Sequence, residues 1–308
     1  MGVAIERKRV QTRAKGDAGR RTGSVGALLS AKGFAVTMGL PLLAWQIAFF
    51  LGAVVVLVLM SFWSLENFRI VHHYILGNWK DVFSSSLFRS VYVHTIWYTG
   101  LSAVVGVVLA FPFAYGLAFH VPPAVRRAAL LLLIIPFFTS YLIRSYSWTF
   151  ILADGGLLNR FLGLFGLRHL ALQGSLLSLQ IGYLTYFFPL VTLVILLSLM
   201  NVDRSLIEAA NNLGGGRVRS VFTVVIPSAR IGLVFGFAFA FMLALGDYIA
   251  PAFGGSGKRT TLSVLVVDAT KAGGDFPQAA AIAVIMVITL LAVLFLAFAF
   301  AFPRKRRV

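Results

Sequence analysis

The chain of 308 residues has no cysteine and few acidic residues. Without thiols it has neither a disulfide framework nor thiolate chemistry. Only 12% of its residues are charged and 59% are hydrophobic, which is far from the composition of a soluble domain. We therefore expect an integral membrane protein. The histidines follow no metal-ligand spacing, so the sequence predicts no metal site; they are His72, His73, His94, His120 and His169.

A complete nucleotide-binding loop is also missing. Residues 254–261 superficially resemble one, but Ala252 replaces the first required glycine and Arg259 stands where Ser or Thr should follow Lys258. No other enzyme site is apparent, so we expect no catalytic residues and no cofactor bound by this chain. Any ATP chemistry should then belong to another polypeptide.

Long apolar runs are what the chain has in abundance. A helix needs about 20 apolar residues to cross the hydrocarbon core of a bilayer, and six segments reach that length. A soluble protein with six buried helices and almost no amphipathic ones would be exceptional. Pro136 lies inside the third segment, where a missing N–H permits a kink. The six predicted spans are residues 37–62, 94–120, 128–152, 178–200, 229–251 and 279–302.

Basic residues predict the orientation of the spans. Of the 27 Lys and Arg residues, 18 fall on the side that holds both termini and eight on the other side. Because Lys and Arg accumulate in cytoplasmic loops, both termini should be cytoplasmic. We expect the basic tail 1–36 to be disordered and held near anionic lipid headgroups, with a second basic tail at 303–308. No basic domain with interleaved aromatic residues accompanies the first tail, which argues against nucleic-acid binding.

The connection at residues 201–228 is predicted to form two short helices. Asp203 or Ser205 caps the first, and Ser205 with Glu208 has the spacing of a capping box. Gly214 permits the left-handed turn that ends a helix, and the second helix should end before Pro227. From the residues alone, this segment is equally well a surface connector or a helix-turn-helix across the cytoplasmic mouth of the bundle.

This connection closely resembles the signature loop of the permease subunits of binding-protein-dependent ABC importers. The loop has the form Glu-Ala-Ala, three residues, Gly, and later a hydrophobic residue with Pro. The resemblance implies that it inserts into a cleft on an ATPase subunit, with Glu208 as a polar anchor and Gly214 as the turn. Gly215-Gly216 departs from the usual pattern, and we expect a looser turn there. The matching positions are Glu208, Ala209, Ala210, Gly214, Ile226 and Pro227.

Other stretches resemble the spermidine/putrescine branch of the same family, and the resemblance runs from about residue 37 to the C-terminus. It implies a type I importer permease in the bacterial inner membrane and a small polar organic substrate, a polyamine or related amine. Relatives with these motifs also import amino-acid-like compounds and organophosphonates. The stretches are residues 136–148, 154–159, 245–251 and 275–277.

Arg144 and Asp247 are charged residues inside apolar segments, where a charge costs roughly 2.5–3.5 kcal/mol. At 1.5 Å per residue, each lies roughly 25 Å from the cytoplasmic end of its segment, so we expect them to pair when no substrate is bound. Tyr141, Arg144 and Trp148 share one helical face, and Tyr248 follows Asp247. These five residues are the predicted substrate path. An ion pair that only joins two helices is an equally good interpretation.

The sequence thus predicts an all-α membrane protein with six transmembrane helices in residues 37–302. The resemblance implies a second permease subunit, two ATPase subunits carrying ATP and Mg, an external substrate-binding protein, and alternating access driven by the ATPases. The competing interpretation is a stand-alone secondary transporter or channel. It requires an inverted repeat or an acidic residue for ion coupling near mid-bilayer, and neither is apparent. A membrane scaffold without transport is a third alternative.

Overall fold

The computed structural model describes residues 39–66, 69–255, 257–271 and 274–302. The basic tails predicted at 1–36 and 303–308 lie outside these residues. The chain divides into two units, residues 1–57 and 58–308, and each is described by itself. The first unit contains most of the helix Gly39–Met60, whose side chains are largely exposed, as with Leu42 at 70%.

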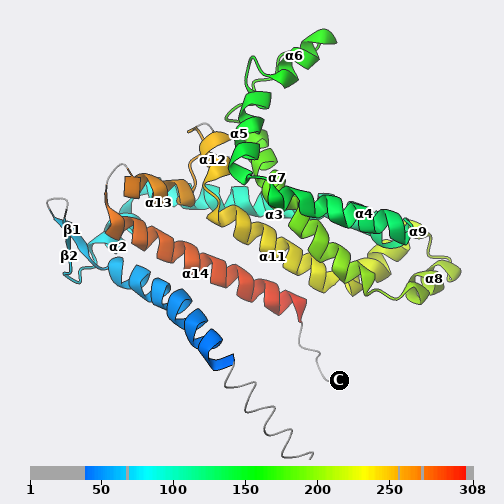
Figure 1. Cartoon of the computed structure of the whole chain (residues 1–308), viewed down its shortest axis with the longest axis horizontal. Helices are drawn as coiled ribbons and strands as arrows, with labels where there is room; N and C mark the ends of the chain where they lie inside the picture. The colour runs from blue at the N-terminus through cyan, green and yellow to red at the C-terminus, as the bar shows by residue number, and fades with distance from the viewer. Residues whose placement is uncertain (1–38, 67–68, 256, 272–273, 303–308) are drawn as a thin grey trace, which may run out of the picture. The chain divides into compact units, whose positions relative to one another are not determined.

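The second unit is built mainly of helices (Figure 1). The all-α prediction needs one correction, because two short strands form an antiparallel hairpin in which Ser64 pairs with Val71. The elements in chain order are β1 Ser64–Glu66, β2 Arg69–Val71, α2 Gly77–Ser84, α3 Ser86–Phe119, α4 Pro123–Ile134, η1 Ile135–Phe138, α5 Tyr141–Leu152, α6 Leu157–Leu164, α7 Leu176–Met200, α8 Arg204–Asn212, α9 Arg217–Ser220, η2 Val221–Val225, α10 Ile226–Ser228, α11 Arg230–Gly246, α12 Ile249–Phe253, α13 Leu262–Lys271 and α14 Phe276–Ala301.

Four helices of the described residues are long and apolar enough to cross a membrane: Gly39–Met60, α3, α7 and α14. Two further candidates are bent pairs of helices. If each bent pair is one span, the number rises to six. Four of the predicted segments are thus single long helices, and the other two, 128–152 and 229–251, fall on bent pairs of helices.

The first bent pair turns by 91° between Phe138 and Tyr141, directly after the 3-10 turn that contains Pro136. The predicted span 128–152 is therefore bent, and the break lies just after Pro136, where the sequence permits a kink. A proline has no N–H for the helical hydrogen bond and its ring crowds the preceding turn, which favours a break here.

The second bent pair turns by 72° near Ala229, between the stretch Arg217–Ser228 and α11. The predicted segment 229–251 is also interrupted, because α11 ends at Gly246 and α12 begins at Ile249. Asp247 lies in this interruption with an extended backbone, at φ −81° and ψ 124°.

The core of the second unit forms around α7, which packs against α3 and α11 (Figure 1). The α7 side chains at successive four-residue intervals are fully buried, so one stripe of the helix faces the core. A hydrogen bond of 2.6 Å from Ser102 Oγ to Gln180 Oε1 joins α3 to α7 inside this packing. By contrast, α4 has no buried residue. The buried stripe is Tyr183, Phe187, Val191, Ile195 and Leu199.

Candidate functional site

The connection at residues 201–228, which the resemblance assigns to contact with an ATPase subunit, is called the coupling segment below. Its first helix, α8, begins with an N-cap. Asp203 is the capping residue, and its Oδ1 accepts the backbone N–H of Ser205 at 2.9 Å. This hydrogen bond favours the charged carboxylate and lowers the pKa of Asp203. Of the two capping residues considered from sequence, the structure therefore has Asp203.

A left-handed turn ends α8 at Gly214, whose φ is +79°. The N–H of Gly214 donates to Asn211 O and the N–H of Gly215 to Ala210 O, each at 3.0 Å. These two bonds are those of a Schellman motif, in which glycine takes the left-handed position at low cost. The turn predicted at Gly214 is thus present.

The turn after Gly214 is tighter than the sequence led us to expect. A Cβ at Gly215 would lie 2.6 Å from Ala210 O, so only glycine fits there without a shift. Ser220 Oγ donates to Asn211 Oδ1 at 2.7 Å and ties the start of the second helical stretch to the end of α8. The role of Ser220 and Asn211 was missed from sequence, because a contact across a turn leaves no periodic signal.

The second stretch does not end before Pro227, as predicted, but runs through α9, η2 and α10 to Ser228. In η2 the helix widens to a π-helix, in which the N–H of Ile226 donates to Val221 O. The wider turn comes directly before Pro227, which lacks an N–H and whose ring crowds the preceding turn. The signature Pro227 therefore lies inside the helical stretch rather than after it.

The surface of the coupling segment is exposed and partly apolar. Glu208, Ala209 and Pro227 are exposed and Ala210 is half-buried. Leu213, beside the turn, is 89% exposed, and Phe222 is 66% exposed. Large apolar side chains at this exposure in a polar connection are typical of a surface that contacts another protein.

Two of the five predicted substrate-path residues, Tyr141 and Asp247, contact each other at the break between α11 and α12. Asp247 is only 6% exposed. Its carboxylate accepts the backbone N–H of Ile249 at 2.8 Å and of Ala250 at 3.3 Å, and also the hydroxyl of Tyr141 from α5. The carboxylate thus caps α12 and also holds the start of α5, which lies beside α12 (Figure 1).

The predicted ion pair between Arg144 and Asp247 is wrong for this structure. Arg144 Nη1 donates to Thr185 O on α7 at 3.3 Å, and its buried Nε has no hydrogen-bond partner among the described residues. The depth estimate assumed a straight helix from residue 128. Because the chain turns by 91° before α5, Tyr141 rather than Arg144 reaches the carboxylate.

The predicted polar-aromatic face of α5 is the more buried one. Tyr141, Arg144 and Trp148 are half-buried and Ser145 is buried, whereas Leu142 and Ile143 are exposed. Tyr248 next to Asp247 is 40% exposed.

Sequence reasoning missed two tyrosines of α7 at this place. The ring of Tyr186 stacks on Tyr141 at a centroid distance of 4.3 Å, and Tyr183 is fully buried. Their spacing of three residues in the predicted fourth span was the only available signal, since adjacent positions on a helix face lie three or four residues apart.

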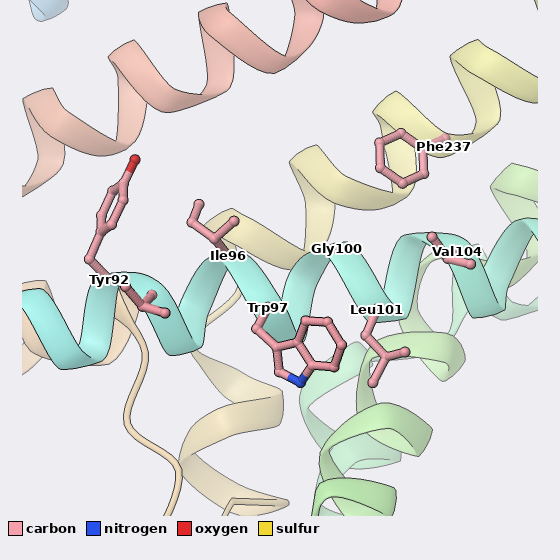
Figure 2. A pocket seen from close by; sticks show the side chains of 8 residues that line it. Tyr92, Ile96, Trp97, Gly100, Leu101, Val104 and Phe237 are labelled. Atoms are coloured by element: carbon pink, nitrogen blue, oxygen red, sulfur yellow. The ribbon is translucent and has the colours of Figure 1, made fainter.

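An apolar groove of about 650 Å³ lies elsewhere, between α3 and α11. Figure 2 shows Trp97, Leu101 and Val104 along α3, with Phe237 on α11. None of the predicted site residues lines it, and its apolar lining does not suit a polar solute.

Comparisons with known proteins show the family of the chain. Residues 103–308 match the family model described as the binding-protein-dependent transport system inner membrane component. The inner membrane ABC transporter permease protein YdcU of Escherichia coli (strain K12) is 28% identical over 266 residues, which cover 81% of this chain and 84% of that protein. The spermidine/putrescine transport system permease protein PotB of the same organism is 28% identical over 207 residues, or 66% of this chain and 74% of PotB.

Among solved structures, a bacterial ABC transporter involved in the import of the acidic polysaccharide alginate has a similar fold. The TM-score is 0.69 at 17% identity, with 90% of this chain and 98% of that chain covered. A second structure, of a bacterial alginate ABC transporter in complex with a pentasaccharide-bound periplasmic protein, gives a TM-score of 0.68 at 15% identity and covers 87% and 93%. Because the family model matches more than half of the chain, this protein belongs to the inner membrane components of binding-protein-dependent transport systems, the permeases of ABC importers.

Proposed function

We propose that this chain is one permease subunit of an ABC importer for a small organic amine, a polyamine or a related compound. It crosses the inner membrane six times, with both termini in the cytoplasm. It pairs with a second permease subunit and two ATPase subunits, which carry ATP and Mg, and receives substrate from an external binding protein. Alternating access, driven by closure of the ATPases, moves the substrate.

The exposed coupling segment supports ATPase-driven transport. Glu208 in the middle of α8 and Leu213 at its C-terminal end are exposed, and hydrogen bonds hold the turn that follows, so the segment is a rigid element rather than a loose connector. A rigid element transmits the motion of a partner to the helices that follow it. In this chain the segment leads through the bend near Ala229 directly into α11.

The buried Asp247 is the observation that supports an amine. Burying a carboxylate within an apolar bundle costs free energy, and a cation beside the carboxylate offsets that cost. The resemblance to PotB points to the same class of substrate, because that relative's name includes spermidine and putrescine. The likeness to the alginate transporters extends to the fold alone.

Uptake by the reconstituted complex tests this function. The chain, a second permease, the ATPase subunits and the binding protein are assembled in liposomes, and uptake of radiolabelled putrescine is followed with and without ATP. We expect uptake only with ATP and loaded binding protein. Asp247→Asn should abolish it while the complex still assembles, because the amide lacks the charge but keeps an oxygen acceptor. Uptake by the chain alone, without ATP, would instead establish a stand-alone transporter.

A further inference from the structure

Tyr183 presents a buried hydroxyl with nothing to bind. The residue is 0% exposed, and its Oη has no hydrogen-bond partner among the described residues. Buried polar groups are almost always paired, so an unpaired one calls for an explanation such as a missing water or ligand. Tyr98 on α3 is also buried, but its hydroxyl accepts a hydrogen bond of 3.0 Å from Arg259.

Tyr183 lies on the part of α7 that packs against α12, the short helix that follows Asp247. Its neighbour Gly182 packs so closely on α12 that a Cβ there would lie 2.9 Å from that of Ala250, three residues after Asp247. One turn further along α7, Tyr186 stacks on Tyr141, which itself donates to Asp247.

We propose that Tyr141, Tyr183 and Tyr186 form, with Asp247, a cage that receives one alkylammonium end of the transported amine. The proposal rests on the proposed function and adds the residues that recognise the substrate. Aromatic faces and a carboxylate are the groups that bind an ammonium in a desolvated site. The Tyr183 oxygen accepts one of its N–H groups, which gives the orphan hydroxyl a partner. Arg144 on the same face of α5 is directed to the carbonyl of Thr185 instead.

The cage is closed in this structure, because Asp247 and Tyr183 are buried and the Tyr141 hydroxyl occupies the carboxylate. Tyr141 belongs to α5, which follows the 91° bend, whereas Tyr183 and Tyr186 belong to the central helix α7. An arriving ammonium replaces the neutral hydroxyl of Tyr141 at the carboxylate. The exchange is favourable because it puts a full positive charge beside the negative one. It also releases α5 from the α11–α12 break.

Tyr183→Phe tests the cage, because it removes only the orphan hydroxyl. In the complete complex we expect the number of putrescine molecules moved per ATP to fall by roughly tenfold, as for loss of a hydrogen bond to a charged group. The melting temperature of the purified complex without amine should stay the same or rise, since an unsatisfied buried hydroxyl is lost. Membrane insertion should be unchanged.

Two matched tyrosines serve as controls. Tyr146→Phe changes a half-exposed hydroxyl on α5 outside the cage and should behave as wild type. Tyr98→Phe removes one of the hydrogen-bond acceptors of Arg259 and should lower the melting temperature. If Tyr183→Phe lowers the melting temperature as Tyr98→Phe does, the hydroxyl has a structural partner such as an ordered water, and the cage is overturned.

The wild-type complex separates the cage from the function on which it rests. If it imports putrescine and the Tyr183→Phe complex moves as much per ATP, only the cage is wrong. If the wild-type complex imports no amine at all but moves another solute, the proposed function fails first, whatever Tyr183→Phe does.

Discussion

A single carboxylate, Asp247, ends one helix and starts the next. It accepts two backbone N–H groups of α12 and the hydroxyl of Tyr141, so it has a structural duty in addition to any contact with substrate. Loss of an N-cap acceptor typically costs about 1 kcal/mol. Asparagine keeps an acceptor and alanine does not, so Asp247→Asn is the substitution that separates charge from capping.

Arg144 caps no helix among the described residues. In the described part of the chain its guanidinium makes one long hydrogen bond, of 3.3 Å to Thr185 O, so we expect Arg144→Gln to leave the melting temperature of the complex unchanged or slightly higher. Putrescine uptake should be retained, since a positive charge beside the path does not favour a cation. If the substrate were a carboxylate or a phosphonate, Arg144 would be its recognition group, and uptake of that anion would be lost in this variant. Parallel assays with an amine and an anion distinguish the two cases.

Gly214 is the residue on which the coupling turn depends. Its φ of +79° costs a residue with a Cβ about 1–2 kcal/mol, and more for a β-branched one. We expect Gly214→Val to distort the turn, so that the complex loses substrate-stimulated ATPase activity or its ATPase subunits while the chain stays inserted. The control is Asn212→Ala, an exposed α8 position whose side chain makes no bond among the described residues. Normal uptake by Gly214→Val would contradict a coupling role for the segment.

At the scale of an element, α8 depends on its cap. The Ser205 N–H lowers the pKa of Asp203, so the cap is present above the unfolded-state pKa and is lost as the pH falls through the folded-state pKa. We expect amide exchange in the first turn of α8, corrected for intrinsic rates, to lose protection over this acidic range. Asp203→Asn still caps but does not titrate, so its protection should not follow the pH. The same pH dependence in both proteins would show that another group is responsible.

The coupling segment and the α11–α12 break lie at opposite ends of one helix. The stretch Arg217–Ser228 bends into α11, and Asp247 follows the last residue of α11. A movement imposed on the segment can therefore reach Asp247 through a single rigid helix of 17 residues. This connection supports coupling by a helix shift, without a chain of intervening side chains.

At the scale of the whole molecule, the topology follows from the distribution of charge. With 18 basic residues on one side and eight on the other, both termini should be cytoplasmic. A reporter fused after Val308 should behave as cytoplasmic and one inserted near Lys258 as external. An external C-terminal reporter, or a cytoplasmic one near Lys258, would break the six-span arrangement.

The sequence by itself determined the membrane class, the apolar segments, the family signature and the turn at Gly214. These are local properties: hydropathy needs only a window of about 20 residues, and a left-handed turn needs only a glycine in the right place. The N-cap at Asp203 was predicted for the same reason, with Ser205 as its alternative.

Only the tertiary structure decided which side chains meet. The bend after Pro136 changes the direction of the chain, and it brings Tyr141 instead of Arg144 to Asp247. Tyr183 and Tyr186 enter the site because α7 packs against α12, and no pattern within either segment records that contact. Composition and spacing describe a helix along its own axis, whereas a site between helices depends on where each one bends and on which neighbour it packs.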